Sequence, residues 1–444
     1  MGTGIGHYIP LVAYLGFWIM SVVSLGGKPL LGLYYMLPFI PYRSLRDHFL
    51  DYPLGTNMLT ILVLCVVVGA LLHGKRLPKS NLYLIWLIYA VYLYLSMWIG
   101  MALSNAPAPL WLSDANFVTW KDYMVIPLVF VAVGLTVEDR KAIRTVILIT
   151  AISLLFIDRS CILESMSRSW TSFDESKRSG GPLAYGSNQT AAFLAQFTMF
   201  FWGFAQFLKR KKFKLLCYGL VATTLFATMY TFSRGGYLAV LCSVLFLGLL
   251  KDRKLLPILA VFLLTWQTVV PAPVRERVNM TENSNGQLES SAEERVQLWQ
   301  NAERSILSNP IIGTGYATFQ YGEHVDNLKD THNWYVKILV ETGLVGLLIA
   351  MALLQQLLAI SYRLFKHTTD PLYRGLGLGL LLAICACLVA NFFGDRWTYL
   401  EITGLLWALA ATAARALQLS ISESIPVPSE ADSMNPTNPY MTYR

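Results

Sequence analysis

The chain has 444 residues, of which 55% are hydrophobic and only 14% charged, and its formal net charge is +8 at pH 7. Soluble domains average about 25% charged residues, so this composition excludes a water-soluble protein. The positive excess lies in short clusters between apolar runs, without the aromatic-basic or helix-turn-helix patterns of nucleic-acid-binding proteins, so nucleic acid is excluded as a partner.

Long apolar runs recur along the whole chain, and a helix needs roughly 20 such residues to cross the hydrocarbon core of a bilayer. The runs cover residues 7–25, 54–72, 82–101, 122–135, 146–157, 187–208, 215–231, 237–250, 255–270, 334–360, 375–393 and 398–414. The stretch 29–41 is apolar but interrupted by prolines, which predicts a short or re-entrant element. The sequence therefore predicts an all-α, polytopic membrane bundle of about twelve transmembrane helices.

Clusters of lysine and arginine separate the runs and predict which loops face the cytoplasm. The clusters lie at residues 75–79, 140–144, 209–214, 251–254 and 363–374. With the predicted spans between them, all of these clusters fall on one side of the membrane. The loops 102–121, 158–186 and 271–333 then face the opposite, outer side.

This order predicts four parts of the chain. Residues 1–180 form N-terminal transmembrane helices, 181–350 form a core that includes the outer loop 271–333, 351–418 form C-terminal transmembrane helices, and 419–444 form a tail. The tail is rich in serine, proline and asparagine, which predicts a disordered cytoplasmic segment.

The outer loop contains helical signals. Ser291 and Glu294 resemble a capping box, and Val296, Trp299 and Ile306 follow at near-helical spacing. We expect an amphipathic helix from about residue 293 to 307, on the membrane surface or on the bundle. Further along the loop, a threonine at position 331 is expected to cap the next helix, with the following two residues in its first turn.

Two arginines on the outer side carry groups suited to binding a ligand. Arg234 lies between Ser233 and two glycines at the outer end of an apolar run, and Arg295 lies on the expected loop helix. Taken alone, each is more typical of a snorkelling or solvated arginine. The alternatives for the same role are Arg275, Arg277 and Arg304.

A third outer feature is His332-Asn333, followed by Glu341. Histidine has an ordinary pKa near 6.5, which suits a general base for a sugar hydroxyl, and a helix N-terminus disfavours its cationic form. A lone loop histidine is more often polar surface, and His324 in the same loop is an alternative. The remaining histidines, His7, His48, His73 and His367, lie on the cytoplasmic side or near the N-terminal region.

The combination of these residues on one face indicates a single site. Arginine binds phosphate oxygens through two parallel hydrogen bonds and keeps its charge, so Arg234 and Arg295 are suited to holding a diphosphate while His332 activates an acceptor hydroxyl. No aspartate-rich metal motif accompanies them, and Asp395 and Arg396 on the same face could simply pair with each other.

These motifs resemble the O-antigen ligase and polymerase family over a core of about residues 186–350. The resemblance rests on Ser-Arg-Gly at 233–235, Arg295 to Trp299, Asn-Pro-Ile-Ile-Gly-Thr-Gly at 309–315, and His332-Asn333 followed by Glu-Thr-Gly at 341–343. The motif at 309–315 and the histidine motif are its most specific parts. Gly-Gly-Pro at 180–182 and Asn188 also look like a segment of this family, close to the site.

The resemblance implies a periplasm-facing glycosyltransferase of the GT-C type in a bacterial inner membrane. It implies that Arg234 and Arg295 hold the diphosphate of a glycan donor on undecaprenyl diphosphate, that His332 is required for transfer, and that the acceptor is lipid A-core or a related glycolipid or glycan. Asn188, Ser233, Asn333 and Glu341 are supporting candidates. We expect no cofactor and no metal, because the arginines would neutralise the leaving group.

Three alternatives stay open at this point. A polymerase of O-antigen or exopolysaccharide would share the motifs and the donor, although the single long outer loop favours a ligase slightly. A transporter or flippase of polysaccharide or lipid would explain the spans, but such proteins usually carry ionisable residues at mid-membrane and internal repeats. A scaffold without catalysis would leave the convergence of arginine and histidine unexplained.

Overall fold

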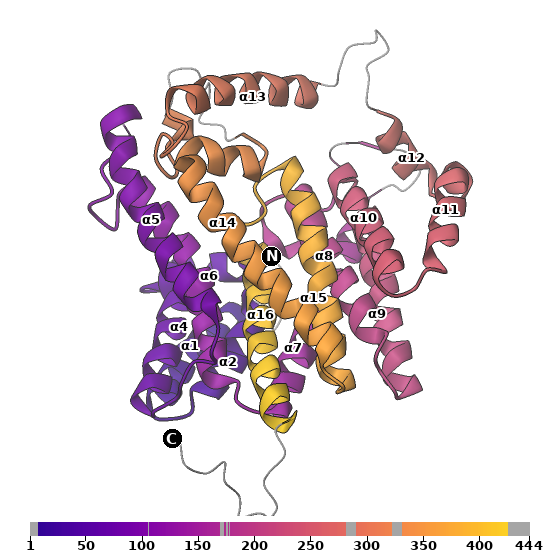
Figure 1. Ribbon diagram of the computed structural model, residues 1–444, viewed down its shortest axis with the longest axis horizontal. Helices are drawn as coiled ribbons and strands as arrows, with labels where there is room; N and C mark the ends of the chain where they lie inside the picture. The colour runs from indigo at the N-terminus through magenta and orange to yellow at the C-terminus, as the bar shows by residue number, and fades with distance from the viewer. Residues whose placement is uncertain are drawn as a thin grey trace, which may run out of the picture.

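The computed structural model describes residues 8–104, 106–168, 173–174, 176, 178–280, 290–321 and 331–424, and these are helices and connecting loops with no strand (Figure 1). The long helices are α1 (Ile9–Leu25), α4 (Met58–Leu72), α5 (Asn81–Ser104), α6 (Ala115–Thr136), α7 (Arg140–Met166), α8 (Ser187–Ala205), α9 (Lys211–Met229), α10 (Arg234–Leu250), α11 (Leu255–Val269), α14 (Trp334–His367), α15 (Pro371–Ala390) and α16 (Leu400–Ser424). Each predicted apolar run coincides with one of them, so the all-α prediction is confirmed.

Shorter helices connect or cover the long ones. They are α2 (Pro29–Met36), η2 (Leu37–Phe39), α3 (Arg43–Arg46), η3 (Asp47–Asp51), η4 (Gly55–Asn57), η6 (Gly181–Leu183), α12 (Ala272–Asn279), α13 (Ser290–Ser308), η7 (Phe319–Tyr321) and η9 (Asn391–Phe393). The proline-interrupted stretch near residue 30 forms the short helix α2 and the 3-10 turn η2, in agreement with the short element expected there.

Within the described residues, 7 helices are long and apolar enough to cross a membrane, and the count is up to 8 if the bent pair α11 and α12 forms one broken span. The chain bends by 106° between the two helices of that pair. Helices α1 and α10 are apolar but shorter, with 17 residues each. The chain is therefore a polytopic helical membrane protein.

Helices α15 and α16 form the centre of the bundle. Helix α15 packs against α8, α10, α14 and α16, and α16 also packs against α6. In their apolar windows, 94% of α16 and 72% of α15 is buried inside the protein, against 33–50% for the other five. Helix α15 approaches α8 closely where Gly203 faces Gly379, because a Cβ on Gly203 would lie only 2.9 Å from the Gly379 Cα. Small residues allow such close contact between helices in membranes.

The loop helix α13 runs across one end of the bundle and packs on α14 (Figure 1). An amphipathic helix is thus confirmed, and its expected apolar residues divide between buried and exposed positions. Leu298 and Ala302 are buried, whereas Val296 and Trp299 are exposed. Ile306 packs against the same buried cluster, because positions four residues apart, 298, 302 and 306, form the stripe that meets α14. The side chains of the expected capping box lie outside the described residues.

The C-terminal helix α16 extends further than expected. It continues to Ser424, so the first five residues after Leu419 are helical and not disordered. Leu417 and Leu419 still pack against the apolar core, which favours helix at this end. Residues 425–444 lie outside the described part of the chain.

Helix α14 is interrupted at Gly343, whose φ of 63° and ψ of −167° are not helical. The backbone groups that the break releases pair with the Asn-Pro-Ile-Ile-Gly-Thr-Gly motif. The Gly315 N–H donates to the Glu341 carbonyl (2.7 Å), and the Leu344 N–H donates to the Pro310 carbonyl (2.9 Å). A Cβ on Gly343 would lie 2.3 Å from a carbonyl oxygen of that motif, so only glycine fits. The two most specific sequence motifs are therefore two halves of one backbone contact.

Candidate functional site

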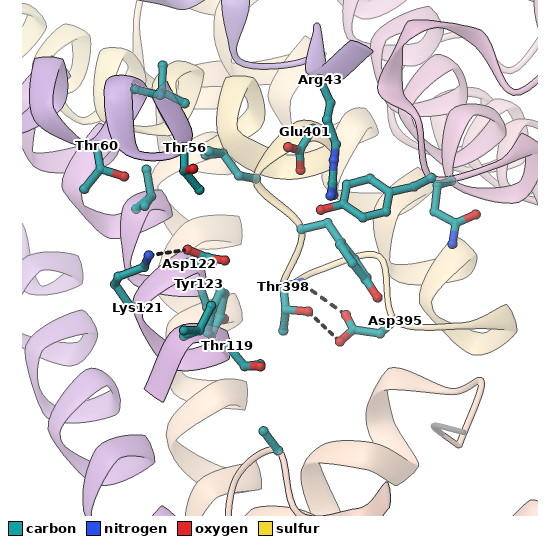
Figure 2. Close-up of a pocket in the computed structure, with 18 of the residues that line it drawn as sticks. Arg43, Thr56, Thr60, Thr119, Lys121, Asp122, Tyr123, Asp395, Thr398 and Glu401 are labelled. Atoms are coloured by element: carbon teal, nitrogen blue, oxygen red, sulfur yellow. Dashed lines mark hydrogen bonds and ion pairs between the residues drawn. The ribbon is translucent and has the colours of Figure 1, made fainter. Parts of the chain in front are cut away.

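A cavity of about 690 Å³ lies among α3, α6, the start of α16 and the first turns of α14 (Figure 2). The basic residues of its lining are Arg43, Arg46, Lys121, Lys337 and Arg396, and the acidic residues are Asp47, Asp122, Glu341, Asp395 and Glu401. Tyrosines and threonines fill the spaces between them. The cavity is therefore polar, although the bundle around it is apolar.

Two of the predicted site residues, His332 and Glu341, line this cavity. The other candidates, Arg234, Arg295, Asn188, Ser233 and Asn333, are not among the described residues of its lining. Arg234 belongs to the start of α10, Arg295 belongs to α13, and His332 comes just before α14. These three parts of the chain lie at the same end of the bundle (Figure 1). The cavity thus joins the histidine to residues that the sequence motifs do not include.

His332 is held by a cap and by strained backbone. Asn333, and not Thr331 as expected, is the N-cap of α14: its side chain accepts from two backbone N–H groups at 3.0 and 3.3 Å. His332 therefore precedes the helix, with a φ of 48° that costs about 1–2 kcal/mol in a residue other than glycine. The Trp299 indole N–H donates to the Thr331 carbonyl (2.9 Å), which ties α13 to this turn.

Lys337 and Asp395 form an ion pair across the cavity wall, with Nζ and Oδ2 3.0 Å apart and side chains 15% and 1% exposed. Thr398 donates to the same carboxylate through its hydroxyl (2.6 Å) and its N–H (3.1 Å). Burial raises the pKa of Asp395, but the Lys337 ammonium and the Thr398 hydrogen bonds outweigh it, so the pKa lies below the ordinary value. The Asp395 carboxylate pairs with Lys337 of α14, and the Arg396 guanidinium donates to the Asp395 backbone carbonyl (3.1 Å).

The start of α10 forms a second polar group. Arg234 is the first residue of α10, and its guanidinium donates to the Met280 carbonyl (2.9 Å). The Ser233 hydroxyl and the Arg178 guanidinium both donate to the Asn188 amide oxygen, at 2.9 and 2.6 Å. The structure thus joins two supporting candidates, Asn188 and Ser233, beside Arg234. It adds Arg178, which the sequence reasoning did not single out.

The alternatives considered for the arginine and histidine roles occupy other environments. Arg277 is buried with its guanidinium 4.9 Å from the Phe173 ring centroid, Arg275 donates to the Gln267 carbonyl, and Arg304 is exposed. Arg295 is half-buried on α13. His48, His73 and His367 are exposed and do not line the cavity, while His7 and His324 lie outside the described residues.

The sequence reasoning missed the wall of the cavity formed by α3, α6 and α16. Arg46 of α3 hydrogen-bonds to Glu401 of α16, 355 residues away, and Lys121 of α6 lies 3.3 Å from Asp122. One signal was present, because Glu401 is an acidic residue inside an apolar run, and such residues in membrane helices usually have a partner or a function. Nothing in the sequence indicated that Arg46 is that partner.

These features define a polytopic membrane protein with a polar cavity at the broken N-terminal part of a long helix. Residues 219–351 match the family model described as O-Antigen ligase, so this part of the chain carries the domain of the O-antigen ligase family, and the resemblance is confirmed. The match runs from α9 into α14 and includes Arg234, Arg295, His332 and Glu341. The comparison with curated proteins gave no match.

Proposed function

We propose that this protein is a glycosyltransferase that moves a glycan from undecaprenyl diphosphate to an acceptor such as lipid A-core, in the manner of an O-antigen ligase. In this proposal about twelve helices span a bacterial inner membrane, and the loop 271–333 faces the periplasm. The observation that carries the proposal is the position of His332: it lies within the O-antigen ligase domain and on the wall of a polar cavity.

His332 acts as the general base in the proposed reaction. It takes the proton of the acceptor hydroxyl as that oxygen attacks the anomeric carbon of the glycan, and the bond from this carbon to the diphosphate breaks. The leaving group is undecaprenyl diphosphate, and direct displacement inverts the anomeric carbon. Glu341 lines the same cavity, and in this proposal its carboxylate supports the charged imidazole.

Arg234 and Arg295 bind the diphosphate in this proposal. Guanidinium groups hold phosphate oxygens through paired, charge-assisted hydrogen bonds that each contribute about 1.5–3 kcal/mol. Arg234 stands at the N-terminus of α10, where backbone N–H groups and the helix dipole also favour an anion. The proposed reaction calls for neither a nucleotide sugar nor a divalent metal, because the arginines neutralise the leaving group.

The test is transfer by the purified protein in proteoliposomes, with a lipid-linked glycan as donor and either lipid A-core or a second lipid-linked repeat as acceptor. Product on lipid A-core supports the ligase, and product on the second repeat supports the polymerase that remains the alternative. Movement of the lipid-linked glycan across the bilayer without a new glycosidic bond would instead indicate a transporter and overturn the proposal.

A further inference from the structure

Most residues that line the cavity beside His332 have no role in the proposed reaction. Neither of the proposed diphosphate-binding arginines lines it, whereas His332 does. If the donor's diphosphate lies at Arg234 and Arg295, the cavity stays available for the other substrate. Its far walls come from α3, α6 and α16, outside the matched domain.

The charges of the described lining residues balance. Five basic residues face five acidic ones, and four of the basic residues lie in ion pairs: Arg43 with Asp47, Arg46 with Glu401, Lys121 with Asp122, and Lys337 with Asp395. A phosphate entering this space would meet carboxylates as well as cations. The lining therefore does not favour a strongly anionic ligand.

Paired charges are, however, suitable partners for hydroxyl groups. A carboxylate accepts from a hydroxyl and a guanidinium or ammonium donates to one, so each ion pair offers both functions within a few ångströms. Figure 2 shows Arg43 and Glu401 on one side of the cavity, with Lys121 and Asp122 on the other. A polyhydroxylated ligand between them can satisfy both walls at once.

Aromatic rings complete the lining. The Tyr185 and Tyr399 ring centroids lie 4.7 Å apart at 60°, and the Arg43 guanidinium lies 4.1 Å from the Tyr185 centroid, which fixes that ring. Tyrosine presents an apolar ring face beside a polar tip, and the C–H face of a pyranose ring stacks on such a surface. The volume of about 690 Å³ is that of a small-molecule site, with room for the end of a glycan but not for a whole glycolipid.

We propose that this cavity is the acceptor subsite and that it binds an uncharged sugar end of the acceptor glycan, with a hydroxyl directed at His332. The ion pairs Arg46–Glu401 and Lys121–Asp122 contact its hydroxyls, and Tyr185 stacks on a ring. This assignment rests on the proposed function, because it takes the diphosphate site to lie elsewhere.

Sugar binding without turnover tests the assignment. The probes are two neutral trisaccharides, maltotriose and chitotriose, and the matched pair trehalose and trehalose 6-phosphate, titrated against the full chain in nanodiscs. At least one neutral trisaccharide is expected to bind the wild type, and trehalose 6-phosphate is expected to bind no tighter than trehalose. Absence of binding by both trisaccharides, or tenfold tighter binding of the phosphorylated probe, overturns the subsite.

Variants locate the binding in the cavity. Tyr185→Ala is expected to weaken trisaccharide binding at least tenfold, whereas Tyr185→Phe, which keeps the ring, and Tyr362→Ala, an exposed position on α14, leave it within twofold. Equal binding by Tyr185→Ala and wild type overturns the assignment. His332→Ala separates the two proposals. Full glycan transfer by His332→Ala contradicts the proposed function. Loss of trisaccharide binding in Tyr185→Ala supports the acceptor subsite in either case.

Discussion

The two sides of the cavity are built in different ways. The side that carries His332 and Glu341 belongs to one stretch of the O-antigen ligase domain, held in shape by backbone hydrogen bonds between two motifs. The opposite side joins Arg46 to Glu401 across 355 residues and uses side-chain ion pairs. The difference suggests that the first side supplies the chemistry, which requires fixed geometry, and the second supplies recognition of the acceptor.

The largest expected effect is on the chemical side. His332→Ala should lower the rate of glycan transfer by about 10²–10⁴-fold, the usual contribution of a general base. The rate is measured in proteoliposomes with the lipid-linked donor. His48→Ala, at an exposed histidine outside the cavity, should retain wild-type activity. Full transfer by His332→Ala would show that His332 is not the general base.

The ion pair that joins the two sides should matter most for stability. Lys337→Met leaves the Asp395 carboxylate buried without its ammonium partner, and breaking such a pair costs about 3–5 kcal/mol. We expect a lower thermal unfolding midpoint in detergent, whereas Lys212→Met, at an exposed lysine of α9, should leave it unchanged. An unchanged midpoint in Lys337→Met would mean that the two sides are not coupled through this pair.

The backbone contact between Gly343 and the motif at 309–315, on the side of the cavity that carries His332, should tolerate no side chain at position 343. Gly343→Ala adds a Cβ 2.3 Å from a carbonyl oxygen at a positive φ, and we expect a loss of about 3 kcal/mol or more in stability. Gly219→Ala is the matched control, because its Cβ meets nothing within 4 Å and alanine favours helix. Equal unfolding midpoints for the two variants would contradict the close packing of the motifs.

A smaller effect is expected at the proposed diphosphate site. Arg234→Lys keeps the charge but loses the paired hydrogen bonds, which corresponds to about 1.5–3 kcal/mol and a roughly 10–100-fold lower rate of transfer. Arg304→Lys, on the exposed surface of α13, should behave as wild type. Wild-type kinetics in Arg234→Lys would show that bidentate binding at this position is not used.

The smallest expected effect is a dependence of stability on pH. The pKa of Asp395 is lower in the folded protein than in the unfolded chain, so its stabilisation is present above the unfolded pKa of about 3.9 and is lost as the pH falls through the folded value. The unfolding midpoint of the wild type should therefore fall more between pH 5 and pH 3 than that of Asp395→Asn. Identical pH profiles would contradict the lowered pKa.

The sequence by itself determined the helical class, the positions of the apolar helices and the family of residues 219–351, because span length and motif spacing are local properties of the chain. It also singled out His332 and Glu341, which line the cavity. Of the apolar residues expected on α13, Ile306 packs against the buried cluster while Val296 and Trp299 are exposed, since the helix alone does not say which stripe its neighbour α14 will meet.

Only the tertiary structure decided what stands opposite His332. Ion pairs such as Arg46–Glu401 and Lys337–Asp395 join residues far apart in sequence, and no local pattern specifies which charge meets which. The same holds for Gly343, which appears in the sequence as part of a motif and whose role depends on the backbone packed against it. Local periodicity fixed the helices, while long-range packing placed their polar residues around one cavity.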